Sequence, residues 1–290
     1  MPEAMRDLVV NADDLGMTAG INRAIIEAHR AGIVTSASLL ANGAAFDDAI
    51  DQLRRCPDLG VGLHVNLTHG RPLADAAVPS LTSRSGRFRA LGALAIRLSV
   101  GAVSRRDLEA EIDAQAQRII SAGITPTHFD SHENVHLHPA AASALATVAR
   151  RRNVRWVRFR NQRPVLPWML REAGMLRPRD HARHALARLG SRWAADGGNT
   201  QPLRWIVGAP QLPDVSPRHL FGALVRSIED GVTEWVCHPG YADAQLRSLL
   251  TAVHADLREA ELKVLTGPDC RTLLDTAGIR LLSYVNPVRA

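Results

Sequence analysis

Short apolar runs alternate with helical patterns along most of the chain. Residues 8–10 form such a run, and the residues after it place Ile21, Ala24, Ile25 and Ala28 at helical spacing. The alternation predicts further strands at 33–40, 60–67, 127–130, 154–159, 203–207, 233–237 and 279–284. It predicts further helices at 46–53, 104–123, 140–150, 217–228 and 243–261.

Two of these helices have a clear predicted buried face. In the helix that Ser104 begins and Gly123 ends, the face is Leu108, Ile112, Ala116 and Ile119. In the helix at 243–261, it is Leu246, Leu249, Leu250, Val253 and Leu257.

The order of the elements predicts an α/β fold in which parallel strands are covered by helices. About eight strands favour a (β/α)-barrel-like sheet over an open one, and the barrel can be complete, distorted or incomplete. We expect one catalytic domain over residues 1–290, because nothing resembles a linker between domains. Two irregular inserts, near 69–103 and 161–202, interrupt the rhythm; such segments act as lids or binding loops, or are inert surface excursions.

Composition places the chain among ordinary globular proteins. Hydrophobic residues make up 46% and charged residues 22%. The net charge is +6 and the pI is about 10.1, and the positive charge is almost entirely arginine, since Lys263 is the only lysine. A basic surface can attract nucleic acid or anionic lipid. However, the arginines are scattered, and neither a nucleic-acid-binding module nor an interleaved basic and aromatic stripe is found, so no nucleic-acid partner is predicted.

Targeting and redox features predict a cytoplasmic protein. Cys56, Cys237 and Cys270 are too few and too dispersed for a disulfide framework or a thiolate zinc site. The sequence shows neither a secretory signal nor an apolar run long enough to be a transmembrane segment. Peripheral contact with a membrane stays open.

Acidic and imidazole side chains follow several predicted strands. Asp13 and Asp14 come directly after the first strand, where adjacent carboxylates repel each other unless a positive group lies nearby. His64 lies within an apolar strand, with Asn66 on the same face two residues later. Taken alone, each pattern also has a purely structural interpretation, a turn for the aspartates and a hydrogen-bonded core residue for the histidine.

Four imidazoles crowd the segment 127–139, which is unusual for a core. His132 follows the strand that ends near Asp130, and Asp130 or Glu133 could orient a ligand histidine. His238 follows a later strand and precedes a Pro-Gly turn, which leaves it free to act as a general acid. The cluster consists of His128, His132, His136 and His138.

Parallel strands bring their carboxyl ends to one edge of a sheet, so these patches are expected to meet. One carboxylate and two histidines with open positions suit a Lewis-acid metal, and a spare aspartate beside it suits a base. The sequence therefore predicts a metal-dependent hydrolase. Two alternatives remain: another metal-dependent barrel enzyme, such as a sugar isomerase or phosphoester hydrolase, and a non-catalytic basic binding protein.

Five ordered blocks resemble the YdjC-like carbohydrate deacetylases, the family of the chitooligosaccharide deacetylase. They are 11–16 (NADDLG), 33–38 (IVTSAS), 62–68 (GLHVNLT), 130–132 (DSH) and 238–241 (HPGY). The resemblance implies a (β/α)-barrel-like fold, removal of acetyl groups from N-acetylated sugars, and one divalent metal ion. By family description the ion is Mg²⁺, whereas the nitrogen ligands favour Zn²⁺. A homodimer is also compatible with the family.

Carried over by position, the resemblance places the metal ligands at Asp14, His64 and His132, the base at Asp13 and the acid at His238. Substrate-binding or supporting roles are expected for Asn66, Asp130, His136 and Arg158. Relatives often have a further histidine where this chain has Glu133-Asn134, which leaves the role of His136 open. The substrate is an acetylated sugar, an oligosaccharide or a glycolipid, since a related branch acts on sugar-bearing hopanoid lipids; the sequence does not decide among them.

Overall fold

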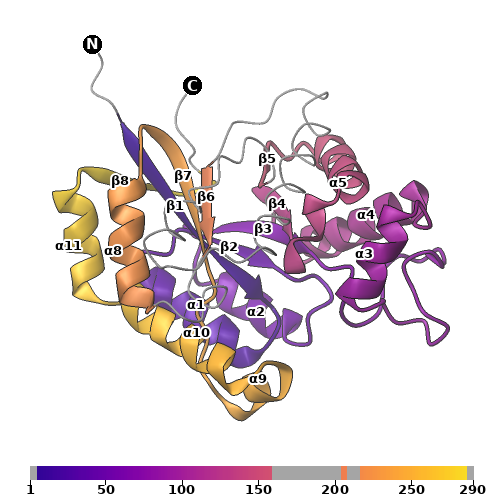
Figure 1. Cartoon of the computed structure of the whole chain (residues 1–290), viewed down its shortest axis with the longest axis horizontal. Helices are drawn as coiled ribbons and strands as arrows, with labels where there is room; N and C mark the ends of the chain where they lie inside the picture. Colours follow the sequence, from indigo (N-terminus) through magenta and orange to yellow (C-terminus); the bar gives the residue numbers. More distant parts are fainter. Residues whose placement is uncertain (1–4, 159–203, 208–215, 286–290) are drawn as a thin grey trace.

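The computed structural model describes residues 5–158, 204–207 and 216–285. Parallel strands form a curled half-barrel sheet covered by helices, as the sequence predicts for a distorted (β/α)-barrel (Figure 1). The spatial order is β5-β4-β3-β2-β1-β7-β6, and β8 pairs with the first part of β1. The strands are β1 Arg6–Leu15, β2 Ser36–Leu39, β3 Gly60–Val65, β4 His128–Ser131, β5 Trp156–Val157, β6 Arg204–Val207, β7 Gly231–Cys237 and β8 Ile279–Leu282.

The helices pack their apolar faces against this sheet. The predicted faces of α1 and α4 are confirmed, since every residue named for them is buried. Ser104 caps α4 by accepting a hydrogen bond from the backbone N–H of Asp107. The helices are α1 Ala19–Arg30, α2 Phe46–Leu53, α3 Leu91–Ser99, α4 Arg105–Ser121, the 3-10 helix η1 His132–Leu137, α5 Pro139–Arg151, α8 Pro217–Ser227, α9 Ala244–Leu249, α10 Ala252–Leu265 and α11 Pro268–Thr276.

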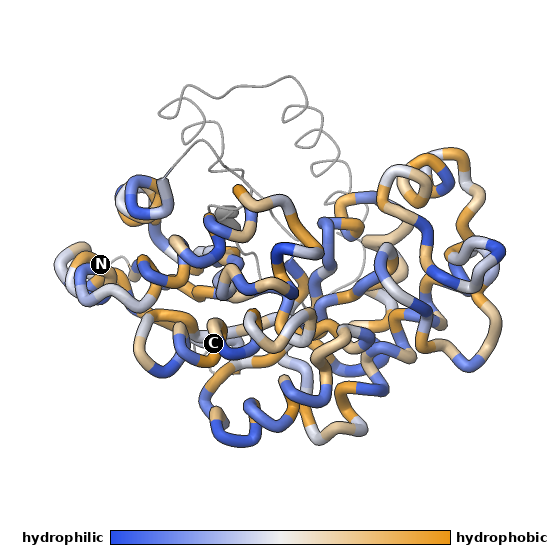
Figure 2. The backbone as a smooth tube through the Cα atoms, turned by 90° about the horizontal axis from the view of Figure 1, so that it is seen from below, coloured by the Kyte–Doolittle hydropathy of each residue, from blue (hydrophilic) through white to orange (hydrophobic). Residues whose placement is uncertain are grey.

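The central strands are buried on both sides, and this explains their apolar sequences. β1, β2, β3 and β4 contain hardly a residue that reaches solvent. Hydrophobic and hydrophilic residues are mixed in short stretches along the tube in Figure 2, as is expected of amphipathic helices. Within the described parts of the chain, no helix has both the length and the apolar character needed to cross a bilayer.

The predicted helix at 243–261 is wrong in two respects. It is two helices, α9 and α10, because Leu250 adopts an extended conformation and Thr251 caps the second helix. The predicted buried face is also wrong, since Leu249 and Val253 are 56% and 57% exposed. The buried face of α10 instead includes Arg258 and Glu261, so this helix turns charged side chains inward.

Helices that the periodicity did not reveal complete the fold. The insert at 69–103, predicted as irregular, contains α3, in which only Leu94 and Leu98 are buried. The helix α11 was also missed; it follows α10 after a short turn at Gly267. The second insert, at 161–202, lies outside the described residues.

Gly62 in β3 is fixed by close packing against an imidazole ring. A Cβ atom at this position would lie 2.4 Å from His128 Cε1. We expect Gly62→Ala to destabilise the protein by about 1–3 kcal/mol, because the ring of His128 is held by neighbours on both sides and cannot withdraw freely. Chemical denaturation measures the change.

Gly92 in α3 provides the matched control for this substitution. A Cβ atom there would meet nothing within 4 Å. Gly92→Ala should be neutral or slightly stabilising, because alanine favours a helix by up to about 1 kcal/mol. Equal stability of the two alanine variants would contradict the packing argument.

Candidate active site

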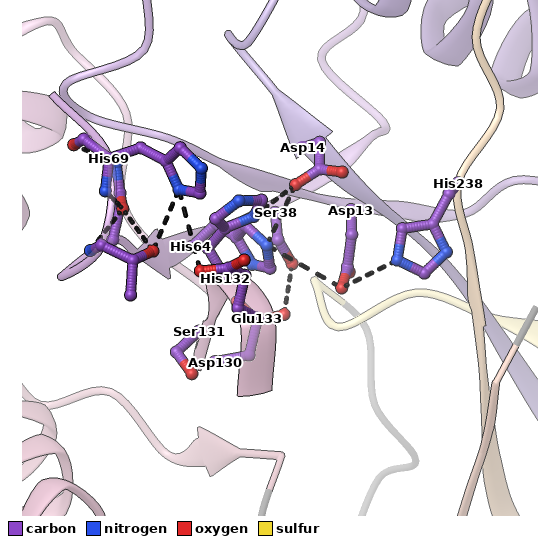
Figure 3. Close-up of polar contacts among 12 residues, drawn as sticks. Asp13, Asp14, Ser38, His64, His69, Asp130, Ser131, His132, Glu133 and His238 are labelled. Carbon is purple, nitrogen blue, oxygen red and sulfur yellow. Dashed lines mark hydrogen bonds and ion pairs between the residues drawn. The ribbon is translucent and has the colours of Figure 1, made fainter. Parts of the chain in front are cut away.

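Side chains from four separate segments meet at the carboxyl edge of the sheet. Asp13 and Asp14 lie near the end of β1, His64 lies in β3, His132 begins η1 directly after β4, and His238 follows β7 (Figure 3). The structure thus brings together the five residues that the sequence proposed for the metal and the proton transfers.

A β-bulge explains how two adjacent aspartates face one centre. Successive side chains of a regular strand point to opposite faces. The register of β1 against β2 slips after Ala12, so that one extra residue lies in β1. Asp14 takes up the irregularity with a φ of 70°, a left-handed conformation that aspartate tolerates better than most residues. Both carboxylates consequently turn toward the same site.

Asp14 contacts both His64 and His132. Its Oδ1 accepts a hydrogen bond from His132 Nδ1 at 2.8 Å and lies 3.4 Å from His64 Nε2. Its Oδ2 accepts one from Arg258 Nη2 at 2.5 Å. Burial alone would raise the pKa of Asp14, but Arg258 and His132 outweigh it and hold the pKa well below its usual range. Asp14 is therefore a carboxylate at any physiological pH.

Asp130 orients His64 from behind. His64 Nδ1 donates to Asp130 Oδ1 at 2.7 Å, which directs Nε2 toward Asp14 and Asp13. Burial alone would lower the pKa of His64, but the neighbouring Asp130 and Asp13 outweigh burial and raise the pKa to about 10. A carboxylate behind a histidine is the usual arrangement for fixing a metal-binding imidazole.

Arg158 clamps the second aspartate. Its Nη1 and Nη2 donate to the two carboxylate oxygens of Asp13 at 2.8 and 2.7 Å, a bidentate geometry. The same guanidinium lies 2.6 Å from Asp130 Oδ2 and 3.0 Å from Glu234 Oε1. Burial raises the pKa of Glu234 to about 7 despite the opposing effect of Arg158. Arg158 therefore fixes Asp13 and ties it to the carboxylate that orients His64.

His238 lies on the other side of Asp13. Its Nε2 is 3.8 Å from Asp13 Oδ2, and its backbone N–H donates to Glu261 of α10 at 2.8 Å. Burial lowers the pKa of the His238 imidazole to about 4, with a smaller opposing effect from Asp13. His238 is thus neutral near pH 7 and must receive a proton before it can give one away.

Two of the residues for which substrate-binding or supporting roles are expected, Asn66 and His136, have hydrogen-bond partners within the structure. The side-chain amide of Asn66 accepts from the backbone N–H groups of Thr68 and His69 and donates to Asn42, so it holds the turn after β3. His136 is fully buried, and its Nδ1 hydrogen-bonds with Ser131 Oγ at 2.7 Å. Neither lines the cleft described below.

Sequence reasoning overlooked three residues of the site. His69 lies in the turn after β3, and its ring centroid is 5.1 Å from that of His132. Glu234 could have been noticed as a charged residue inside the apolar strand β7. Arg258 gave no signal, because the apolar positions of its helix pointed to a different buried face.

A cleft of about 830 Å³ opens over the site. Its floor is polar and includes the five site residues together with Arg258. Its walls include apolar side chains of α3, of η1 and of the turn between α9 and α10: Leu91, Leu94, Leu98, Val135, Leu137 and Leu250. A pocket of this size and mixed character suits an organic ligand.

The residues present fit a divalent cation. One ligand atom each from Asp14, His64 and His132 lie within 4.8 Å of one another. Around them, buried carboxyl groups outnumber buried guanidinium groups even when Glu234, with its pKa of about 7, is left out, so a cation that replaces the proton of His64 would balance negative charge. The carboxyl groups are Asp13, Asp14, Asp130, Glu234 and Glu261, and the guanidinium groups are Arg158 and Arg258.

Buried neutral histidines make stability sensitive to acid. Burial lowers the pKa of His128 to about 4 and that of His136 to about 3, whereas the unfolded values are near 6.5. Above pH 6.5, both histidines are neutral in the folded and the unfolded chain, and the free energy of unfolding does not depend on them. Below pH 6.5, these histidines become protonated in the unfolded chain but stay neutral in the folded one. The free energy of unfolding therefore falls by up to about 1.4 kcal/mol per pH unit for each histidine. Denaturation curves between pH 7 and 4.5 measure the slope.

Two variants test the assignment of this slope. His128→Gln should reduce the slope of the free energy of unfolding against pH, because it removes one buried neutral imidazole. His219→Gln, a change at an exposed histidine, should leave it as in the parent protein. An unchanged slope in His128→Gln would contradict the explanation.

Comparisons with known proteins identify the family of the chain. The family described as YdjC-like protein matches residues 7–276. A carbohydrate deacetylase of Geobacillus stearothermophilus is 36% identical over 280 residues, covering 96% of this chain and 97% of that protein. A chitooligosaccharide deacetylase of Yersinia pestis (strain Pestoides F) is 29% identical over 282 residues, covering 96% and 98%.

A solved structure supports the fold. It is that of a protein of Enterococcus faecalis V583 assigned provisionally to cellobiose-phosphate cleavage. Its TM-score against this chain is 0.74 at 24% sequence identity, and the match covers 97% of this chain and 98% of that one. Likeness at this identity speaks for the architecture alone.

Proposed function

Because the chain belongs to the YdjC-like family, we propose that it is a metal-dependent carbohydrate deacetylase, which hydrolyses the N-acetyl group of an acetylated sugar or sugar-bearing lipid. The observation that carries the proposal is the convergence of Asp14, His64 and His132, with Asp13 and His238 beside them, on the floor of one cleft. This arrangement supports a role for the first three residues as a cation site and for the other two as base and proton donor.

Asp14, His64 and His132 would hold the cation. When bound, it would supply Lewis-acid polarisation of the acetamide carbonyl. Two imidazoles and one carboxylate favour zinc over magnesium, which prefers oxygen ligands. Asp130 holds His64 in the orientation that this task requires.

Asp13 acts as the general base in this proposal. It takes a proton from the water that attacks the acetyl carbon, and Arg158 keeps its carboxylate aimed into the site. The clamp also restricts Asp13 from turning to coordinate the cation. General base catalysis by a positioned group contributes about 10²–10⁴-fold.

His238 delivers a proton to the departing amine. Because its imidazole is neutral at pH 7, the proton must reach it during the reaction, and Asp13 is 3.8 Å away. In this proposal, the proton that Asp13 removes from water passes to His238 once the two groups approach to hydrogen-bond distance, and then on to the amine nitrogen. The C–N bond then breaks, and acetate and the free amino sugar leave.

The mixed character of the cleft bears on the substrate. The polar floor suits a sugar and its acetamide, and the apolar wall on α3 suits either the faces of further sugar rings or an attached lipid. We therefore keep acetylated sugars, oligosaccharides and glycolipids as the substrate classes to compare.

An acetate-release screen tests the proposal. Metal-free protein and protein supplied with Zn²⁺ or Mg²⁺ are incubated with N-acetylated monosaccharides, oligosaccharides and glycolipids. We expect acetate from at least one class, only with metal. A protein that binds metal stoichiometrically yet releases no acetate, while it isomerises a sugar or cleaves a phosphoester, would overturn the assignment.

A further inference from the structure

Exposed apolar side chains adjoin, in sequence, two of the segments that line the cleft. On α3 and its C-terminal cap, Ile96 and Val100 are 67% and 71% exposed, and they neighbour the cleft-lining residues 95 and 99. At the turn between α9 and α10, which also lines the cleft, the exposed Leu249 and Val253 are next in sequence to the lining residues 250 and 254. We call these four residues and Leu91 the mouth patch; its members are Leu91, Ile96, Val100, Leu249 and Val253.

The exposure of α3 is unusual for a surface helix. Only two of its nine residues are buried, and Arg97 is its only charged residue. A helix that packs one stripe on a core normally shows polar side chains on its outer face. An apolar outer face marks an interaction surface.

Positive charge surrounds this helix. Residues 76–106 include the arginines 84, 87, 89, 97, 105 and 106 but contain neither aspartate nor glutamate. Arg84, Arg87 and Arg106 are exposed. An apolar helix framed by arginines is the pattern of a segment that lies in the interface of an anionic membrane.

We propose that the mouth patch and the arginines of residues 76–106 dock this protein onto an anionic phospholipid surface. The cleft mouth then faces the bilayer, and the apolar side chains of the mouth patch enter the headgroup region. A second copy of the chain is the weaker candidate for this surface, because a two-fold interface would set the arginine segment against itself or close to it. The proposal concerns binding and does not depend on the proposed deacetylation.

Vesicle co-sedimentation of the full chain tests the docking. The probes are vesicles of phosphatidylcholine alone and vesicles that contain phosphatidylglycerol in addition. We expect binding to the anionic vesicles that weakens with added salt, and little binding to the neutral ones. Absence of binding to anionic vesicles at low salt would overturn the proposal.

Variants separate the two components of the surface. Ile96→Ser with Val100→Ser should reduce partitioning about tenfold, because the lost apolar contact area is that of two side chains. Arg84→Gln with Arg87→Gln should reduce it by about tenfold or more at low salt and little at high salt. All four side chains are exposed, so folding should be unaffected, which thermal denaturation verifies.

Helix α11 provides matched controls at the other end of the molecule (Figure 1). Leu273 is 44% exposed there, and Arg271 is exposed too. Leu273→Ser and Arg271→Gln should leave vesicle binding unchanged. Equal losses in these controls, or a change in oligomeric state without a change in vesicle binding in the α3 variant, would contradict docking by the mouth patch.

Discussion

Replacing Asp13 by asparagine is expected to lower kcat by about 10²–10⁴-fold while metal binding persists. The amide has nearly the shape of the carboxylate but cannot take a proton from water. Arg158 would still contact one oxygen at this position, so the site should keep its framework. Steady-state kinetics and metal analysis on the same preparation separate the two effects.

Asp51→Asn is the control for this change. Asp51 is an exposed aspartate paired with Arg54, remote from the cleft lining. It should retain the parent kcat and metal content. Full turnover in Asp13→Asn would remove Asp13 as the base, and loss of metal in that variant would make it a ligand instead.

Replacing His64 by glutamine is expected to abolish stoichiometric metal binding, and activity with it. Changing a residue that merely supports a ligand weakens metal affinity by about 10–100-fold, so loss of a ligand should exceed this. The change also leaves Asp130 without its histidine partner in a buried setting. Isothermal titration with Zn²⁺ measures the affinity, and elemental analysis measures the content.

His219→Gln serves as the control here as well, since an exposed histidine on α8 has no part in the site. It should bind one equivalent of metal as the parent protein does. Parent-like affinity in His64→Gln would show that the cation lies elsewhere, for instance at the partly exposed group of His69, His132 and Glu133.

The parallel α/β fold and the meeting of the motifs could be predicted, because the alternation of strands and helices follows from periodicity. Apolar runs such as that at β1 and the helical spacing in α1 and α4 are strong local signals. Because parallel strands have their carboxyl ends at the same edge of the sheet, the residues that follow these strands lie at that edge. That reasoning brought together the segments that contain Asp13, Asp14, His64 and His132, and the resemblance to the family singled out the three metal ligands among them.

The remainder depended on tertiary contacts that leave little trace in sequence. The bulge in β1, which turns Asp13 and Asp14 to one side, depends on an irregular register with β2. The inward face of α10 was misjudged because Leu249 and Val253 have the spacing of a core stripe, whereas Arg258 and Glu261 are the buried residues. Their burial is tolerated because both are hydrogen-bonded. Arg258 donates to Asp14, and Glu261 accepts from the backbone N–H of His238 after β7.

Crystals soaked with zinc, with anomalous diffraction recorded at the zinc absorption edge, test the central claim most directly. The account predicts one strong peak within about 2.0–2.2 Å of one oxygen of Asp14 and one nitrogen each of His64 and His132, with Asp13 held by Arg158 beside it. A fully occupied peak bound by other residues, or a protein that takes up no metal while releasing acetate, would contradict it.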